Sequence, residues 1–599
     1  FVVGVSLFGC GSESAPVPVR PVSTEPWSPD VYVSFDADGT LRIISHRSEM
    51  GQGIRTGLPA VLADEMEADW SRVVVEQATG DAKYGDQNTD GSHSVRDFMH
   101  RMREAGATVR RMLEQSAAEQ WGVDVAECRA DLHKVVHQSS GRALDYSELV
   151  AGAAALPVPG LEQLTFKSRD EFRYIGKDLP IVDMHDMTHG TANYGADIRL
   201  PGMKFAAIAR PPVVFGKVKS YDASRTLAVA GVEQVVEIPA AEPPALYKAL
   251  GGLAVIASNS WAALKGRDLL SVEWDDGPNA DYDSAAYKTA LLETVRRPGT
   301  VQRNEGDVDA ALAAAERKIE AEYYAPHLAH APMEPPAAVA SVTPEFCEVW
   351  APVQDPQSLI PMAEAVTGLN PGQIRINVTL LGGAFGRKSK CDFAEEAVYL
   401  SKQLGTPVLV QWSREDDIRH DYFHSVSAQR LEAGLDERGA VTAWKHRACY
   451  PTIFSTFDAA AREPVTLELG LGAQNLPYAI PNLQLETGPI DSKVRIGWLR
   501  SVCNIQHAFG INCFAHELAV AAERDPAEYL LDLIGPARRV DLGEDARYRN
   551  YGKPLQDFPI DTGRLRSVTE TVMAAAGWGS TLPPGHAMGI AAHRSFLSY

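Results

Sequence analysis

Cysteine is scarce in this sequence, and the few cysteines present are scattered. Seven occur in 599 residues, and no Cys-x-x-Cys pair is among them. That spacing excludes a zinc ribbon or a ferredoxin-type iron–sulfur cluster carried by this chain. The nearest pair, Cys503 and Cys513, is interpreted as two buried thiols. Chemistry that needs an iron–sulfur centre must therefore take it from another chain.

Long apolar runs and an excess of positive charge are also missing. No apolar stretch reaches the roughly 18 residues that a membrane-spanning helix needs. The 57 lysines and arginines face 78 acidic residues, a net charge of −21. This balance argues against a nucleic-acid partner, because such binding depends on neutralising phosphates. At 45% hydrophobic residues, the chain has ample material for the cores of about three to five domains, which excludes intrinsic disorder.

The N-terminal segment predicts export. The chain begins with Phe1 rather than Met, and residues 1–12 resemble the end of a signal-peptide apolar region without its charged start. Leu7-Phe8-Gly9-Cys10 also resembles a lipoprotein cleavage box, in which Cys10 would carry the lipid. An ordinary N-terminal arm packed on the body is the alternative. The polar, proline-rich residues 12–29 read as a linker, so we expect a periplasmic protein, either free or attached to the membrane.

The first 172 residues alternate between strand-like and helix-like patterns. Period-two alternation predicts a hairpin and period-3.6 spacing predicts helices. Residues 140–173 carry only a weak pattern and are expected to be a connector. The predicted elements are a hairpin over 31–35 and 41–44, a helix beginning near Leu58, a strand over 73–76 and an arginine-rich helix over 98–118.

The remainder divides into two parts. Residues 173–274 are strand-rich, with one helix near 261–270, and predict a separate small α/β domain. Further on, a buried-type strand over 375–381, a helix with Phe393 and Leu400 on its apolar face, and a strand over 407–412 form a βαβ pattern. Gly405 would cap that helix. Asp525-Pro526 predicts another helix start, as N-cap and N1 proline.

Three turns carry residues suited to binding a ligand. Glu49-Met-Gly-Gln-Gly53 lies between a strand and a helix, where glycines permit close approach and the helix N-terminus attracts an anion. Gly382-Gly-Ala-Phe-Gly386 is a second such turn, with Arg387 and Lys388 expected to supply positive charge. The third is Gln354, an amide held between two prolines. Each turn alone is more often structural than functional.

Other motifs fail on spacing. Residues 383–389 resemble a P-loop, but a P-loop needs glycine directly before lysine, and here Arg387 intervenes. The sequence holds no GxGxxG, HExxH or GxSxG motif. The pairs His327/His330 and His420/His424 have no third ligand nearby, so satisfied or exposed histidines are favoured over a metal site.

Taken together and in this order, the turns resemble a known family. Glu49–Gly53, Met333-Glu-Pro335, Gln354, Gly382–Lys388, Trp498-Leu-Arg500 and His507–Glu517 are similar to the molybdopterin-binding large subunit of the xanthine oxidase family. The early position of EMGQG, ahead of GGAFG, resembles the isoquinoline 1-oxidoreductase branch, which includes periplasmic aldehyde dehydrogenases. The resemblance covers roughly Val31 to Tyr599.

The resemblance implies a mixed α/β and α+β, multidomain fold. Its parts would be molybdopterin-binding domains plus a small α/β domain of the hammerhead type. The expected divisions are 1–29 (signal remnant and linker), 30–172 (first molybdopterin-binding segment), 173–300 (hammerhead-type domain) and 301–599 (main molybdopterin-binding region, incomplete at its C-terminus).

Site roles follow from the same resemblance. Gln354 would hydrogen-bond an oxo ligand of molybdenum, while backbone amides around Phe385 and Arg500 would face the metal's oxygens; no side chain would ligate the metal directly. The residues implied to hold the pterin and its pyrophosphate are Met50, Gly51, Gln52, Gly53, His93, Ser94, Val95, Gly383, Ala384, Phe385, Gly386 and Arg500. Helix starts and backbone amides suit such anionic groups.

The cofactor would be molybdenum with molybdopterin, often as the cytosine dinucleotide. Electrons would leave through a separate [2Fe–2S] subunit, and a c-type cytochrome is a further acceptor suited to the periplasm. The family's general-base glutamate lies in a GEPxxPP-like motif, which this sequence lacks. Met333-Glu334-Pro335-Pro336 is the nearest look-alike but matches another family element. We therefore expect the base beyond Tyr599.

Two departures from the family bear on the substrate. Ser389 stands where purine-oxidising relatives carry glutamate, and no arginine occurs around Leu467–Leu469. Since unpaired polar groups reject substrates strongly, purines fit poorly, and an aldehyde or N-heteroaromatic substrate is expected. Two other classes remain open: a catalytically silent molybdopterin-binding scaffold and a P-loop phosphotransferase.

Overall fold

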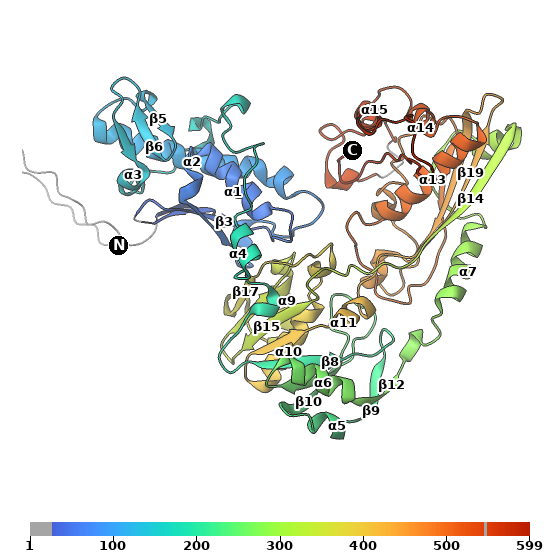
Figure 1. The fold of residues 1–599 in the computed structure, drawn as a ribbon, viewed down its shortest axis with the longest axis horizontal. Coiled ribbons are helices and arrows are strands. Elements are labelled where there is room, and N and C mark those ends of the chain that lie inside the picture. Colours follow the sequence, from blue (N-terminus) through green and yellow to red (C-terminus); the bar gives the residue numbers. More distant parts are fainter. Residues whose placement is uncertain (1–26, 37, 544–547) are drawn as a thin grey trace, which may run out of the picture. The chain divides into compact units, whose positions relative to one another are not determined.

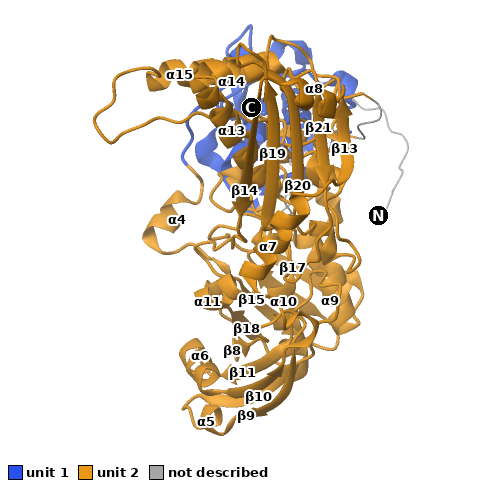
Figure 2. Ribbon diagram, turned by 90° about the vertical axis from the view of Figure 1, so that its right-hand side faces the viewer, with its two compact units in different colours: residues 1–45, 56–76, 98–180 blue, residues 46–55, 77–97, 181–599 orange. Residues whose placement is uncertain are grey.

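The structure is a computed structural model that describes residues 27–36, 38–543 and 548–599. The predicted signal remnant and Cys10 lie outside the described residues. The chain forms two compact units (Figure 2), of which the smaller contains residues 1–45, 56–76 and 98–180 and the larger contains 46–55, 77–97 and 181–599. The predicted domain boundaries stay a prediction. Both the EMGQG element and His93–Val95 belong to the larger unit.

A four-stranded sheet and two long helices build the smaller unit. The predicted hairpin is confirmed, with β2 paired antiparallel to β3. Gly106 lets α2 pack closely on α1, because a Cβ there would come within 2.6 Å of the Leu62 carbonyl oxygen. The elements are β1 (Trp27–Asp30), β2 (Val33–Phe35), β3 (Leu41–Ser45), β4 (Val73–Gln77), α1 (Ile54–Glu65) and α2 (Ser94–Trp121).

The expected connector over 140–173 contains a helix that the sequence pattern missed. α3 (Tyr146–Ala153) begins with a capping box. The Asp145 side chain accepts a hydrogen bond from the backbone of the first turn, and the Glu148 side chain accepts one from the Asp145 amide. The Asp-x-x-Glu spacing was the available signal. A three-stranded sheet precedes it: β5 (Cys128–Asp131), β6 (Lys134–His137) and β7 (Ala143–Asp145).

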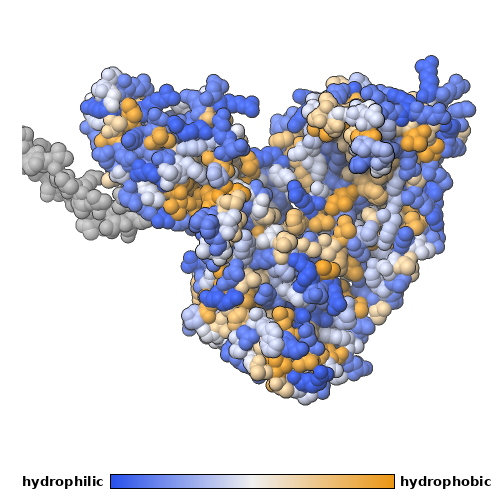
Figure 3. Space-filling view, viewed as in Figure 1, coloured by the Kyte–Doolittle hydropathy of each residue, from blue (hydrophilic) through white to orange (hydrophobic). Residues whose placement is uncertain are grey.

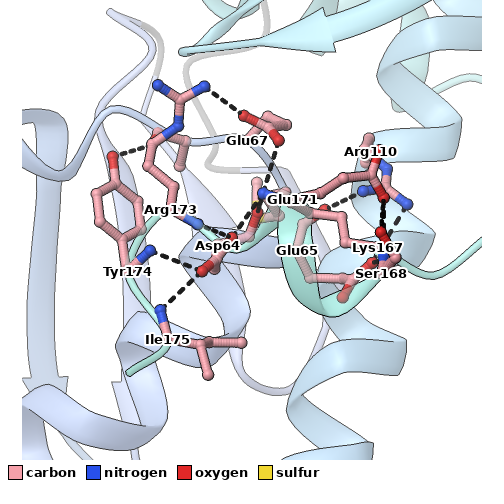
Figure 4. A network of polar contacts seen from close by, with 12 residues as sticks. Asp64, Glu65, Glu67, Arg110, Lys167, Ser168, Glu171, Arg173, Tyr174 and Ile175 are labelled. Atoms are coloured by element: carbon pink, nitrogen blue, oxygen red, sulfur yellow. Dashed lines mark hydrogen bonds and ion pairs between the residues drawn. The ribbon is translucent and has the colours of Figure 1, made fainter. Parts of the chain in front are cut away.

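Buried charges fasten the segment after α3 to α1 (Figure 4). Asp64 accepts hydrogen bonds from Lys167 Nζ at 2.6 Å and from the amides of Tyr174 and Ile175 at 2.7 and 2.8 Å. Glu65 accepts from the Lys167 amide at 2.7 Å. An otherwise unpatterned segment is thereby held by specific polar contacts.

A seven-stranded mixed sheet forms one half of the larger unit (Figure 1). The predicted βαβ pattern is confirmed as β17, α10 (Asp392–Leu404) and β18, with β16 and β15 between the two strands, and Gly405 caps α10 in the left-handed conformation. Strands from both sides of residue 300 share this sheet. In sheet order they are β10 (Val232–Ile238), β11 (Gly252–Ala257), β8 (Lys204–Ala209), β18 (Val408–Gln411), β15 (Ala337–Val342), β16 (Cys347–Ala351) and β17 (Ile374–Val378).

A five-stranded sheet forms the other half. The predicted helix start at Asp525 is confirmed, since its side chain accepts from the amides of Ala527 and Glu528. The strands, in sheet order, are β13 (Thr300–Glu305), β21 (Leu483–Thr487), β20 (Val441–Cys449), β19 (Ser427–Leu435) and β14 (Arg317–Ala325). The helices of this part are α7 (Ser284–Val295), α8 (Val308–Ala314), α13 (Asn504–Ala521), α14 (Pro526–Ile534) and α15 (Thr562–Ala576).

Shorter elements complete the larger unit. Strands β9 (Lys217–Asp222) and β12 (Ser271–Asp275) pair with each other, and the predicted helix near 261–270 is confirmed as α6 (Ser260–Leu269). The other helices are α4 (Met184–His189), α5 (Ser224–Leu227), α9 (Leu359–Thr367), α11 (Arg414–Arg419) and α12 (Thr466–Leu469). Within the described residues, no helix combines the length and apolarity needed to cross a bilayer. The face in Figure 3 mixes hydrophilic and hydrophobic residues, with hydrophilic ones prominent.

Candidate cofactor site

Gln354 joins two loops that are far apart in the sequence. Its side chain is buried, its Nε2 donates to the Thr89 carbonyl oxygen at 2.9 Å, and its Oε1 accepts from the Gly386 amide at 3.0 Å. The backbone repeats the bridge, since the Thr89 amide donates to Gln354 O and the Gln354 amide donates to Lys388 O. The structure thus brings the predicted amide directly against the predicted GGAFG turn.

The GGAFG turn depends on its glycines. Gly386 has a φ of +107°, and a Cβ there would lie 1.8 Å from the Trp498 carbonyl oxygen, so no other residue fits. The Arg500 amide donates to the Phe385 carbonyl oxygen at 2.8 Å. The predicted neighbours Phe385 and Arg500 are therefore together. The Arg500 amide hydrogen itself is given to Phe385, and the predicted role of the backbone amides around Phe385 and Arg500 toward the metal's oxygens stays a prediction.

Backbone strain gathers at the same place. Phe385, Ser501 and Val502 are not glycines, yet their φ values are +57°, +77° and +51°. Such residues cost free energy and persist where surrounding contacts hold them, commonly at ligand sites. The Phe385 side chain is 41% exposed despite being large and apolar. This turn presents an aromatic face that the protein itself does not cover.

The EMGQG element supplies its own anion. The Glu49 carboxylate accepts from the amides of Gly51 at 2.8 Å, Gly53 at 2.9 Å and Arg55 at 3.1 Å, at the start of α1. The expectation that this helix start attracts a ligand anion is therefore wrong, because a buried carboxylate already satisfies these donors. The element is nevertheless part of the site, since the Leu381 amide donates to Glu49 O at 2.9 Å.

Arg47, just before the EMGQG element, contacts the predicted segment His93–Val95. Its Nε donates to Ser94 Oγ at 2.9 Å and its guanidinium lies 3.3 Å from His93 Nδ1. Ser48, the next residue, donates from Oγ to the Val353 carbonyl at 2.7 Å. His93–Val95 thus lies at the start of α2, tied to the segment that precedes EMGQG. Val95 is 45% exposed and its side chain remains available for contact.

Arg387 and Lys388 do not supply positive charge to a ligand, contrary to the prediction. Both are buried: Arg387 makes two 2.9 Å hydrogen bonds to Asp392, and Lys388 Nζ lies 2.6 Å from Glu334 Oε2. A P-loop lysine must reach a phosphate, so this pairing also removes the phosphotransferase alternative. Glu334 has a structural role, because its carboxylate also accepts a hydrogen bond from the Gly382 amide at 3.0 Å.

Ser389 lies behind the turn beside Trp498. Its Oγ donates to the Gly386 carbonyl at 2.8 Å and accepts from Trp498 Nε1 at 2.9 Å. Lys390 Nζ is also buried here, 2.7 Å from the same carbonyl and 3.8 Å from the centre of the Trp498 ring. The resemblance implies a carboxylate at this position in purine-oxidising relatives. In this protein, the Ser389 hydroxyl, the Lys390 amine and the Trp498 indole contact one another there instead.

In the predicted histidine pairs, His327, His330 and His424 make side-chain hydrogen bonds within the protein, while His424 Nδ1 is buried without a partner in the described part of the chain. His330 Nδ1 lies 2.8 Å from Asp421 Oδ2 and its Nε2 lies 3.0 Å from Trp498 O, while His424 Nε2 lies 2.8 Å from Gln506 Oε1. No cluster of three metal-ligating side chains occurs among the described residues. At the place of the absent arginine, Glu468 holds the amide of Ile453 at 2.8 Å.

Sequence reasoning missed three contributors: Arg47, Thr89 and Asn88. None belongs to a recognisable motif, and their roles come from contacts across the fold. The burial of Arg47 beside EMGQG appears only in the folded structure, where an arginine is seldom buried without a structural partner.

The residues present fit a cofactor that carries both hydrogen-bond acceptors and hydrogen-bond donors. Gln354 has two amide hydrogens, and among the described residues only Thr89 accepts one of them. Asn88 Oδ1, in the adjoining loop, is buried without a hydrogen-bond partner in the described part of the chain. With the exposed Phe385 face, these groups offer one donor, one acceptor and one aromatic wall.

Comparisons with known proteins identify the family. Two family profiles described as molybdopterin cofactor-binding domain match residues 293–530 and 3–198. The chain is 28% identical to the membrane-bound aldehyde dehydrogenase [pyrroloquinoline-quinone] of Gluconacetobacter polyoxogenes, over 94% of this chain and 73% of that protein. It is also 28% identical to the isoquinoline 1-oxidoreductase subunit beta of Brevundimonas diminuta, over 86% and 71%.

A solved structure supports the fold. The aldehyde oxidoreductase from Desulfovibrio gigas matches with a TM-score of 0.53 at 18% identity, covering 73% of this chain and 51% of that chain. The chain thus spans about half the length of that structure. The mixed α/β, multidomain fold predicted from the sequence is confirmed. With the two domain matches covering most of its length, the chain belongs to the xanthine oxidase family of molybdopterin-binding large subunits.

Proposed function

We propose that this chain is the large subunit of a molybdenum hydroxylase, an oxidoreductase that oxidises an aldehyde or an N-heteroaromatic substrate with water as the oxygen source. The observation that carries the proposal is the Gln354 bridge, which holds one unaccepted amide hydrogen beside the GGAFG turn. The relatives' printed names, an aldehyde dehydrogenase and an isoquinoline oxidoreductase subunit, support the same two substrate classes.

Several of the predicted residues have positions that support their proposed tasks. Molybdopterin-bound molybdenum supplies the two-electron redox chemistry when bound. Gln354 would donate its second amide hydrogen to an oxygen of the bound metal, and the exposed Phe385 ring would form one wall of the site. The first turn of α2, at His93–Val95, suits a phosphate because its amides point out of the helix start. Gln52, whose Nε2 donates to Ser48 O at 2.8 Å, holds EMGQG in register for the pterin.

Electron transfer requires a second protein. The six described cysteines are free and scattered, which supports a separate [2Fe–2S] subunit as the acceptor, followed in the periplasm by a c-type cytochrome. The pterin would be the cytosine dinucleotide form. Glu334 is paired with Lys388 and is therefore not proposed as the general base.

Localisation is part of the proposal. The apolar first residues and the lipoprotein-like box support export to the periplasm, with Cys10 as the residue that would carry a lipid. Cell fractionation with metabolic labelling by a fatty-acid analogue tests both statements. Cytoplasmic protein would contradict export, and periplasmic protein without label would contradict only lipidation.

Metal analysis with cofactor extraction tests the function. One molybdenum and one pterin per folded holoenzyme, with oxygen from labelled water appearing in the product, is the expected result. Bound molybdenum without turnover on aldehydes and heterocycles would favour the silent scaffold. Folded protein without molybdenum, from a host that makes the cofactor, would overturn the proposal.

Gln354 variants test the carrying observation. Gln354→Ala should lower kcat by about 100-fold or more, the usual cost of losing a donor to developing charge. It should also destabilise the fold by about 1–3 kcal/mol, because Thr89 O and the Gly386 amide lose their partners. Gln354→Glu keeps the acceptor for Gly386 and isolates the donor's role. Unchanged kcat in both variants would remove Gln354 from the site.

A further inference from the structure

Helix α4 of the larger unit carries two histidines one turn apart, His185 and His189 (Figure 2). Residues four apart lie on the same face of a helix. The segment reads His-Asp-Met-Thr-His, which has the histidine spacing of HExxH, a motif whose two histidines hold one zinc ion. Neither histidine belongs to the cofactor site, so their arrangement calls for its own explanation.

The two imidazole rings are stacked. Their centroids lie 4.1 Å apart, with 27° between the ring planes. A zinc–imidazole bond is about 2.0–2.1 Å long, so two nitrogens that share one ion lie no more than about 4.2 Å apart. The rings therefore stand at a separation compatible with a shared ion.

A hydrogen bond along the helix decides which nitrogen of His189 is available to a metal. Its Nδ1 lies 2.8 Å from the His185 carbonyl oxygen, which can only accept, so Nδ1 carries the hydrogen. Thr188 Oγ1, 3.2 Å from the same nitrogen, donates its own hydrogen to the Met184 carbonyl oxygen. In the neutral ring, Nε2 then holds the lone pair. Metal-bound histidines commonly give their other N–H to a carbonyl or a carboxylate in this way.

The surroundings of the pair are open and acidic. His185 and His189 are exposed, as is Asp186 between them. Thr191 Oγ1 donates to Asp186 Oδ1 at 2.6 Å, which holds a negative charge on this turn, where it attracts a cation. Among the described residues, no third metal-ligating side chain joins the two histidines, so water would complete the coordination of an ion.

α4 is tied at its start to the EMGQG element. Asp183 precedes the helix, and its carboxylate accepts two hydrogen bonds from Arg55, at 2.9 and 3.2 Å. The Arg55 amide in turn donates to Glu49. A helix of only six residues is marginal by itself. An ion that joins its two histidines would stabilise the helix and, with it, the Asp183–Arg55 pair.

From the spacing, stacking and orientation of the two rings, we propose that His185 and His189 form an exposed site for a late first-row divalent metal ion, with Cu²⁺ bound most strongly. Imidazole suits copper, nickel and zinc, and copper binds most tightly among them. Mg²⁺ and Ca²⁺ prefer oxygen ligands and should not bind here. The bound ion joins the two turns of α4, and this site does not depend on the proposed function.

Calorimetric titration of Cu²⁺ into the molybdenum-loaded protein tests the site. His185→Phe is the decisive variant, because phenylalanine keeps a ring for stacking on His189 and removes the nitrogen ligand. One Cu²⁺ equivalent should bind more weakly in this variant by at least the roughly tenfold that the loss of an outer-shell partner costs. His586→Phe, which removes a single exposed histidine, is the matched control and should keep that equivalent. Equal Cu²⁺ binding by wild type and His185→Phe would overturn the proposal.

Electron paramagnetic resonance of the bound copper tests the ligand set. Coupling to two imidazole nitrogens is expected in wild type, and to one at most in His189→Ala. Two coupled nitrogens in His189→Ala would show that the ion binds elsewhere. Mg²⁺ in place of Cu²⁺ should give no binding heat that His185→Phe removes, and such heat would contradict imidazole ligation.

Hydrogen exchange tests the effect on α4. Ni²⁺ should slow amide exchange over residues 184–191 and at Arg55 in wild type but not in His185→Phe. Molybdenum content and turnover should be equal in the two proteins, because neither histidine contacts the cofactor site. Absence of turnover in both would count against the proposed function alone, whereas exchange that Ni²⁺ leaves unchanged in wild type would overturn the stabilisation of α4.

Discussion

The two units each bury a network of three acidic and four basic side chains, but the charges of the two networks are paired differently. In the smaller unit, the connector network consists of Asp64, Glu65, Glu67, Lys167, Arg103, Arg110 and Arg173 (Figure 4). In the larger unit, the turn network consists of Glu334, Arg387, Lys388, Lys390, Asp392, Asp421 and Arg495.

Every charged group of the connector network is paired with an opposite charge of the same network. Burial by itself would raise the pKa of Asp64, but the Lys167 ammonium and backbone amides outweigh it and hold the pKa below its ordinary value. The lysine has two carboxylate partners, Asp64 and Glu67, each at 2.6 Å. Every charge there has an opposite neighbour, which suits a purely structural fastening.

The turn network is less complete. Burial, followed by the repulsion of Arg387, lowers the pKa of Lys390 well below its ordinary value, and no carboxylate of the described residues lies within 4.0 Å of its Nζ. Instead, Lys390 Nζ holds the Gly386 carbonyl oxygen. The turn network supports a strained turn although one of its basic groups has no carboxylate partner among the described residues. The difference between the two networks indicates where buried charge serves a site rather than stability alone.

Breaking the turn network at its centre should have the largest effect. Asp392→Asn leaves the buried Arg387 and Arg495 without their shared carboxylate. A loss of about 3–5 kcal/mol in the free energy of unfolding is expected, together with loss of molybdenum. Urea unfolding and metal analysis measure both. Asp532→Asn, a surface partner of Arg524, is the control and should cost less than about 1 kcal/mol.

Breaking the connector network should destabilise without touching the site. Asp64→Asn replaces an acceptor of the Lys167 ammonium and of three amides, so a loss of about 2–4 kcal/mol is expected. The folded fraction should keep its molybdenum and its kcat. Asp131→Asn, which removes an exposed partner of Arg173, should have little effect. Loss of kcat in folded Asp64→Asn would contradict the structural role.

The two regions should also respond to pH in opposite directions. Burial raises the pKa of Glu395, beside Asp392 on α10, to about 7. Between its ordinary pKa and pH 7 the folded protein binds more protons at this group, so the free energy of unfolding falls as pH rises through that window. The contribution is about 3 kcal/mol.

Glu395→Gln should abolish that slope between pH 5 and pH 7 in urea unfolding, since the amide oxygen still accepts from Ala249. Asp64 contributes with the opposite sign, because its pKa is lowered in the folded protein. Its stabilising contribution is fully present above the ordinary aspartate pKa of about 3.9 and is lost only at more acidic pH. An unaltered slope in Glu395→Gln would contradict this account.

The smallest effect on stability is expected from Lys390→Met. Removing an ammonium without a carboxylate partner should change the free energy of unfolding by less than about 1 kcal/mol, because its burial was costly to begin with. The kcat should nevertheless fall, since Gly386 and Trp498 lose a contact. Lys402→Met, on the exposed side of α10, is the matched control. Destabilisation by several kcal/mol would show that the two networks are alike.

Much of the fold was predictable because its signals are local. The hairpin of β2 and β3, α6, α10 with its Gly405 cap, and the Asp525 helix start all follow from periodicity and capping residues. α3 was missed because its apolar pattern is short, although the capping box was present. The predicted domain boundaries and site roles stay predictions.

Several loops that the sequence singled out do contact one another in the structure, but the pairing of their charges was not predictable. Arg387 and Lys388 next to a glycine turn indicated a positive site, yet each has a buried carboxylate partner. Glu49 read as part of a binding element, yet it satisfies the helix start that an external anion was expected to occupy. Partners such as Glu334 lie far away in the chain, so no local pattern reveals them.

The sequence by itself determined the family, the set of turns and the positions that demand glycine, because these depend on neighbouring residues and on backbone dihedral angles. Only the tertiary structure decided which of those turns meet, that residues 46–55 and 77–97 belong with the larger unit, and which charges remain available. The physical reason is that electrostatic pairing and burial act through space, and a charged side chain is neutralised by whatever packing brings within a few ångströms of it.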